Sequence, residues 1–232
     1  MPLRSASCLS SFARKRSTLG VCGVFVLAVL SLGCLKEALF LGYLIGGPPS
    51  IAPDFEEQTN KSLTDYEVTV AVVCYVPKEL KWDFADVDKD IAKYVTHRLH
   101  QKKVKVVRPE SVQDWLDKNP DWDTAAEIGA HFKAKYVVDI EISDYSLYEK
   151  GSSTLYRGRA EVNVTVWEID ENGEGERIYT KPIKSEWPLA VAKPTTEITY
   201  TRFRLMYLQR LSERIGRLFY EHYNGADIGE VM

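Results

Sequence analysis

Two pairs of side chains in this sequence have the spacing that metal binding or catalysis would require. His97 and His100 stand three residues apart in a segment with helical periodicity, a spacing that can bring two imidazoles to one metal ion. Asp139 and Glu141 lie on the same side of an expected strand, as a general acid and base could. An exposed helix end and a polar sheet face explain these pairs without chemistry, and no third ligand stands at motif spacing. We therefore expect no catalytic residue and no metal site.

Sequence motifs of the common enzyme classes are absent from the chain. There is no glycine-rich phosphate loop, no Gly-x-Ser-x-Gly elbow and no His-Glu-x-x-His sequence. The one cysteine of the expected domain, Cys74, falls in an apolar strand, where burial is a simpler explanation than a redox role. The expectation is a protein that is not an enzyme.

The first 34 residues have the pattern of an export signal. Basic residues 14–16 (Arg-Lys-Arg) precede an apolar run that ends in residues 31–34 (Ser-Leu-Gly-Cys). A cysteine directly after a small residue resembles the lipobox of bacterial lipoproteins. That resemblance implies that residues 1–33 are removed as a signal peptide and that Cys34 receives a covalent lipid, the only attached group expected.

An uncleaved membrane anchor is the alternative for the same segment. Residues 18–35 form an almost unbroken apolar stretch of nearly the ~20 residues that span a bilayer. In both cases the basic residues stay cytoplasmic and the rest of the chain faces outward. In Gram-negative lipoproteins an Asp after the lipidated cysteine retains the protein in the inner membrane, and this chain has Leu35. The expected location is the cell envelope, at the outer membrane and facing the periplasm.

Composition favours one globular domain after the signal. Of 232 residues, 45% are hydrophobic and 27% are charged, which is ordinary for a folded protein. The net charge of -3 provides no field for nucleic acid, which is not an expected partner. We expect a lipid-anchor region and linker over residues 34–65, one domain over 66–225 and a tail over 226–232.

Periodicity along residues 66–225 predicts an α/β domain. The helix that opens at Asp86 has an apolar stripe, a capping box at residues 124–127 starts another helix, and Pro182 places the strand 177–187 at a sheet edge. The predicted order is β-α-β-α-α-β-β-β-α, a mixed sheet with helices mainly on one face. The predicted strands are 66–76, 104–107, 136–142, 156–166 and 177–187, and the last helix is 196–223.

This pattern is similar to a known envelope domain. The sequence Ala-Glu-Ile-Gly at 126–129 precedes the sequence Ala-Lys-Tyr-Val-Val-Asp-Ile-Glu at 134–141. With the preceding strands, residues 66–170 resemble the α/β domain shared by the curli-secretion lipoprotein CsgG and the N-terminal domain of the Tol-system protein TolB. The resemblance implies a fold and a role in envelope assembly, secretion or scaffolding, and it assigns no functional residue.

Three sets of residues are candidates for binding a partner. They are Ile183 and Trp187 on the edge strand, the arginines of the last helix, and tryptophans near the ends of the first two strands. The arginines are Arg210, Arg214 and Arg217, and the tryptophans are Trp82 and Trp122. A solvated helix face and lids over the core are the alternatives for the last two sets.

The function expected from these observations is that of a membrane-anchored envelope lipoprotein. It acts through protein contacts as an assembly, secretion-accessory or scaffolding subunit, with an envelope protein or further copies of itself as partner. The membrane is contacted through the lipid or the N-terminal helix. The alternative function is a periplasmic hydrolase or a protein that binds a small ligand or glycan with the loops near Trp82 and Trp122.

Overall fold

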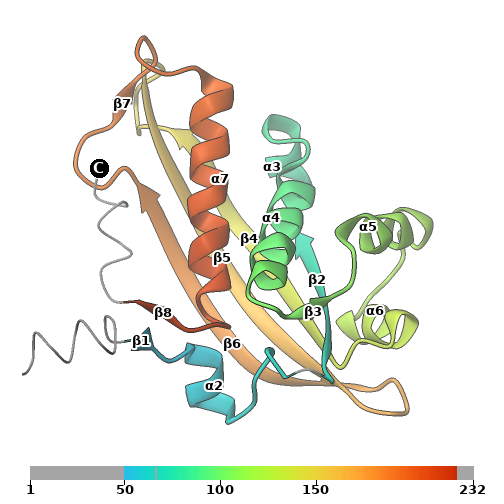
Figure 1. The fold of residues 1–232 in the computed structure, drawn as a ribbon. Coiled ribbons are helices and arrows are strands. Elements are labelled where there is room, and N and C mark those ends of the chain that lie inside the picture. Colours follow the sequence, from blue (N-terminus) through green and yellow to red (C-terminus); the bar gives the residue numbers. More distant parts are fainter. Residues whose placement is uncertain (1–49, 66, 224–232) are drawn as a thin grey trace, which may run out of the picture. The chain divides into compact units, whose positions relative to one another are not determined.

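The computed structural model describes residues 50–65 and 67–223 (Figure 1). Their elements, in chain order, are β1 (Ser50–Ile51), α2 (Asp54–Thr59), β2 (Thr69–Tyr75), α3 (Lys78–Asp83), α4 (Val87–Gln101), β3 (Lys105–Val106), α5 (Pro109–Lys118), α6 (Ala125–Phe132), β4 (Tyr136–Tyr148), β5 (Leu155–Ile169), β6 (Gly175–Trp187), β7 (Lys193–Pro194), α7 (Tyr200–Gly216) and β8 (His222–Tyr223). Within these residues, no helix combines the length and apolar character that crossing a bilayer requires.

One mixed sheet organises the domain. Its strand order is β3-β2-β4-β5-β6, and β7 adds to β5. The neighbours β3, β2 and β4 run parallel, as helical crossovers require, whereas β4, β5 and β6 form an antiparallel meander. The mixed α/β class predicted from the sequence is confirmed.

Helices cover the two faces of the sheet unequally. Along β2, Val70 and Val72 join the larger core with α4 and α7, whereas Ala71 and Val73 face α5 and α6. This follows from the alternation of side chains along a strand that is buried on both faces. The helices α2, α3, α4 and α7 pack on one face, as expected of most helices, and α5 and α6 lie on the other (Figure 1).

Local sequence explains where several helices begin. Asp86 is the N-cap of α4, whose buried residues Val87, Ile91 and Val95 repeat at helical spacing. The predicted capping box is present at α6, where Thr124 and Glu127 exchange side chain to backbone bonds. The last helix is shorter than predicted, because α7 ends at Gly216 and the chain then forms β8, which pairs with β1.

The described residues before β2, 50–65, contribute to the core, which corrects that part of the linker predicted over residues 34–65. Phe55 of α2 is fully buried, with its ring centroid 5.4 Å from that of Tyr179 and 5.8 Å from that of Phe219. The Phe55 N–H donates to the Leu218 carbonyl at 3.0 Å, and Leu63 is also fully buried. Two apolar residues in a polar stretch thus suffice to dock it onto the sheet. The predicted signal, Cys34, the anchor 18–35 and the tail 226–232 lie outside the described residues.

Candidate functional site

The order of the strands creates a crevice between α4 and α5. The strands β2 and β3 are neighbours, yet the helix that follows β2 lies on one face of the sheet and the helix that follows β3 lies on the other. Adjacent parallel strands whose helices diverge in this way leave an opening at their carboxyl ends, where α/β proteins commonly bind ligands. The crevice is therefore the candidate functional site.

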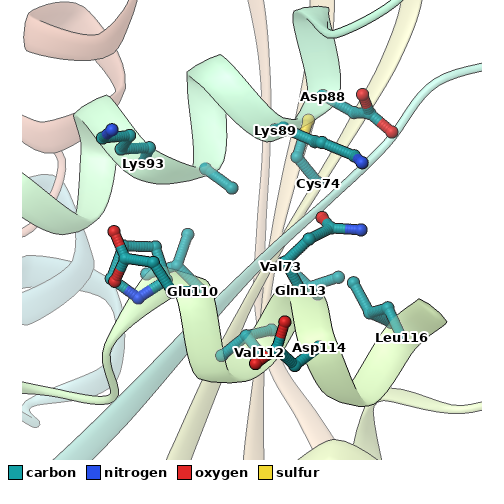
Figure 2. A pocket seen from close by; sticks show the side chains of 13 residues that line it. Val73, Cys74, Asp88, Lys89, Lys93, Glu110, Val112, Gln113, Asp114 and Leu116 are labelled. Carbon is teal, nitrogen blue, oxygen red and sulfur yellow. The ribbon is translucent and has the colours of Figure 1, made fainter. Parts of the chain in front are cut away.

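Two adjoining hollows make up this crevice, which forms a groove between α4 and α5. The first, of about 250 Å³, is lined by β2 around Cys74, by α4 and by α5 (Figure 2). The second, of about 480 Å³, continues along α4 toward His97 and His100. Lys93, Pro109 and Glu110 line both. Figure 2 shows α4 and α5 on either side of β2, with Gln113 of α5 in the space between the helices.

The floor of the first hollow is a strand edge that lacks a partner strand within the described part of the chain but is buried, since Val72 is 1% exposed and Cys74 is 8% exposed. β4 runs beside β2 from Val70 to Tyr75, whereas β3 pairs only with Thr69 and Val70. The Val107 N–H donates to the Val70 carbonyl at 2.8 Å, so Val70 directs its backbone to the β3 side. Backbone groups alternate along a strand, and those of Val72 and Cys74 therefore point to the same side. Among the described residues, no strand lies beside them there.

One wall of this hollow holds a buried carboxylate. Asp88 of α4 is only 8% exposed, and its Oδ2 lies 2.5 Å from the Lys81 ammonium. Its Oδ1 is shielded from water and has no hydrogen-bond partner among the described residues. Burial, followed by the charges of Asp88 and Asp139, raises the pKa of the Cys74 thiol. Cys74 therefore stays a thiol, which is consistent with the packing role expected for it.

The second hollow contains the two histidines that suggested a metal site. His97 and His100 are exposed near the end of α4, and His97 Nε2 lies 2.9 Å from the side-chain nitrogen of Gln101. Arg108 and Lys93 also line this hollow. Across the described residues, no three His, Cys, Asp or Glu side chains are grouped in a way that could hold a metal ion.

The predicted binding residues of the edge strand face the core, which corrects their assignment to a partner surface. β6 is the outer strand of the sheet, as Pro182 predicted. However, Ile183 pairs with Val162 and Trp187 with Gly158, on the face that packs against α7. Their exposed fractions are 6% and 3%. These two side chains stabilise the domain and are not offered to a partner.

The arginines of α7 do not form one exposed stripe, which corrects a second assignment. The Arg210 guanidinium lies over the Trp187 ring, 4.4 Å from its centroid. Arg217 is largely buried and its Nε lies 3.3 Å from Oε1 of Glu213. Arg214 is exposed. The first and last of the three arginines thus serve packing within the domain.

The two tryptophans of the alternative function do not meet. Trp82 of α3 is 83% exposed, and its helix packs through Leu80 on the α7 face. Trp122 is half-buried against the core under α5 and α6, on the opposite face of the sheet. A single ligand site lined by both side chains is not compatible with this arrangement.

The two acids of β4 differ in their surroundings. Glu141 is exposed, whereas Asp139 is half-buried between β2 and β5, opposite Val73 and Thr165. Burial, and to a lesser degree the charge of Glu141, raises the pKa of Asp139 to about 6. A raised carboxyl pKa occurs at catalytic sites and at structural ones alike.

The groove between α4 and α5 was not predicted from the sequence. The predicted β-α-β-α order contained a signal for it. Two successive parallel crossovers produce a switch point when the second and third strands lie on opposite sides of the first. Locating that point required the strand order, in particular that β3 and β4 flank β2 on opposite sides.

Comparisons with solved structures give matches at low identity and with TM-scores below 0.5. No family model matches the chain, and no curated protein matches its sequence. A dodecamer of a PelC variant from Paraburkholderia phytofirmans is 12% identical with a TM-score of 0.40, covering 74% of this chain and 98% of that one. The hypothetical protein CT253 from Chlamydia trachomatis is 16% identical with a TM-score of 0.38, covering 64% and 95%.

A third similar structure is the lipoprotein GNA1162 from Neisseria meningitidis. It is 11% identical with a TM-score of 0.37, and the match covers 64% of this chain and 97% of that one. At this level of similarity, the proposals that follow rest on the residues of the chain itself. The resemblance to the CsgG and TolB domains stays a prediction.

Proposed function

We propose that this chain is an accessory subunit of a bacterial cell envelope that works through protein contacts. In this proposal the chain is tethered through a lipid on Cys34 at the outer membrane, and its folded domain faces the periplasm. The partner is an envelope protein or a further copy of the chain. The observation that carries the proposal is the open outer edge of β6.

The outer edge of β6 offers backbone hydrogen bonds to another chain. β6 has 13 residues and pairs with β5 on one side, and no described strand lies on its other side. Unpaired N–H and C=O groups along such an edge can bind a further strand. An edge of this length supports a specific contact between proteins better than it supports the binding of a small molecule.

Pro182 shows which residues of β6 direct their backbone outward. Proline has no N–H to donate to the ladder, and it is tolerated within a strand where its nitrogen faces away from the neighbour. The register from Thr180 to Trp187 is regular, so Lys184 and Glu186 share the outward orientation of Pro182. Pro182 and the exposed Lys184 also limit indiscriminate pairing of this edge.

A pair of substitutions at Lys184 tests the proposal. Lys184→Pro removes an outward N–H while leaving the ladder to β5 intact, and Lys184→Thr keeps that N–H. Both variants lose the exposed ion pair with Glu161. They therefore differ in the backbone N–H at position 184 and not in that ion pair. We expect co-purification of the partner from detergent-solubilised membranes to be lost with Lys184→Pro and retained with Lys184→Thr.

Folding is checked in the same preparations by circular dichroism and thermal unfolding. If a folded Lys184→Pro protein still recovers the same partners and complements a deletion strain, contact through β6 is excluded. If no partner is recovered with the unmodified chain either, and size-exclusion chromatography shows a monomer, the proposal of a protein-contact subunit is wrong. The alternative, a hydrolase or a protein that binds a small ligand or glycan with the loops near Trp82 and Trp122, stays a prediction.

A further inference from the structure

We propose that the first hollow of the groove between α4 and α5 binds an extended segment of a partner protein, which adds to the sheet beside β2 and presents a basic or other hydrogen-bond-donating side chain to Asp88. The inference rests on the proposed function, because it takes that function to be binding of protein. It concerns a different edge of the sheet from β6. The hollow is called the β2 slot below, and it is lined by residues 72–74, by α4 and by α5.

The backbone of β2 determines the kind of occupant. Val72 and Cys74 direct their N–H and C=O groups into the slot, where the described chain provides no strand. The path of β3 leads toward this position, but the chain turns away at Pro109 to begin α5. An extended backbone placed in line with β3 supplies donors and acceptors at the spacing that Val72 and Cys74 require. Few ligands other than a peptide strand offer that pattern.

The walls of the slot fit the side chains of a strand. Residues of an extended segment alternate between the two faces of a sheet, so its side chains meet α4 on one side and α5 on the other. α4 contributes Ala92 and the stem of Lys89, and α5 contributes Val112 and Leu116. Both helices therefore offer some apolar surface next to the edge, beside polar side chains such as Lys93 and Gln113. A small polar molecule would leave that surface uncovered.

Asp88 indicates the chemistry of one side chain in the segment. A buried carboxylate oxygen without a donor is an unfavourable feature in a folded protein, and Oδ1 of Asp88 is such an atom. Lys81 contacts only Oδ2. A lysine, an arginine or a hydroxyl from the segment would supply the missing donor once it displaces the groups that shield Oδ1. Exposed Glu110 and Asp114 lie on the opposite wall, and their charges are offset by Lys89 and Lys93 of α4, so the preference for a donor rests on Asp88 alone.

Selection from a library of short random peptides tests the inference directly. The library is displayed on phage and panned against the full chain in detergent micelles. Recovered peptides are synthesised, and their affinities are measured for the unmodified chain and for variants. We expect the peptides to be rich in β-branched residues and to share a Lys or Arg position. Amide hydrogen exchange of Val72 and Cys74 should slow in proportion to occupancy.

Variants of the two walls provide the specific readout. Gln113→Trp fills the slot from α5 and Lys89→Trp fills it from α4, and each should abolish peptide binding. Lys118→Trp places the same ring at an exposed position of α5 outside the slot and should leave binding unchanged. Asp88→Asn should weaken the basic peptides by about tenfold or more, since hydrogen bonds to a charged group are the stronger ones. Circular dichroism of each variant establishes that it is folded.

Several outcomes overturn the inference. One is a library that yields no peptide, and another is binding that survives in folded Gln113→Trp and Lys89→Trp proteins. Protection of Val72 and Cys74 that rises with protein concentration in the absence of peptide would assign the slot to a second copy instead. Because β6 is not altered in these experiments, absence of peptide binding to the unmodified chain, or its survival in the two filled variants, refutes the slot alone. Unchanged partner recovery in the Lys184→Pro variant refutes the function proposed for β6.

Discussion

The docking of α2 onto the sheet makes a quantitative prediction at Phe55. Replacing Phe55 with Ala removes a fully buried ring that packs against Tyr136, Tyr179 and Phe219. The lost transfer free energy of the ring is about 2 kcal/mol. The residual cavity, roughly 100 Å³ if the site does not collapse, adds about 2 kcal/mol. We expect Phe55→Ala to lower the free energy of unfolding by about 4 kcal/mol, a large share of the ~5–15 kcal/mol of a typical domain.

Urea unfolding of the full chain in detergent, followed by tryptophan fluorescence, measures this change. Glu57→Ala is the matched control, because Glu57 is exposed on the same helix and its loss should change stability by less than about 0.5 kcal/mol. A Phe55→Ala protein with the same midpoint and slope as Glu57→Ala would show that residues 54–63 do not belong to the folded core. The domain would then begin at β2, as the sequence first indicated.

Two further predictions concern titration and anchoring. The pKa of Asp139, about 6 when folded against an ordinary 3.8, means that the folded state binds more protons between these pH values. The stability conferred by protonated Asp139 is therefore lost as pH rises through about 6, by an amount on the order of 3 kcal/mol. Asp139→Asn should raise the urea midpoint at pH 8 and flatten its pH dependence, and an unchanged slope between pH 4 and 7 would contradict this. Cys34→Ala should release the protein from the membrane or stall it as a precursor, because a lipid chain contributes ~0.8 kcal/mol per buried CH₂. Mass spectrometry of the mature N-terminus checks this, and retention of Met1 in the unmodified protein would exclude lipidation.

Features that depend on local pattern could be predicted from the sequence. The apolar positions 70, 72 and 74 predicted a buried strand, and residues 124–127 predicted a capping box, because both patterns act within a few residues. Pro182 predicted an edge strand for the same reason. The helix α2 was missed because its six residues are mostly polar and carry one buried side chain, Phe55. Tertiary packing holds it, and periodicity over so short a segment is not informative.

Features that depend on strand pairing could not be predicted. Ile183 was expected on a partner surface, and its actual face follows from its register opposite Val162 in β5. The groove required the knowledge that β3 and β4 flank β2 on opposite sides. Arg210 was expected in solvent, and its position over Trp187 follows from how β6 lies against α7. In each case, long-range pairing decided which side chains became available for function.

The pairing of β1 with β8 has a mechanical consequence for the domain. Residues 50–51 pair with residues 222–223, so the described domain is entered and left at neighbouring points. Phe55 contacts Tyr136 at the amino end of β4, whereas the β2 slot lies toward the carboxyl end of the parallel strands. Tension applied through the chain before residue 50 would act first on the β1–β8 pair and on α2, and only then on the six-stranded sheet. Such a load would therefore open the domain at one end while the β2 slot at the other end keeps its structure.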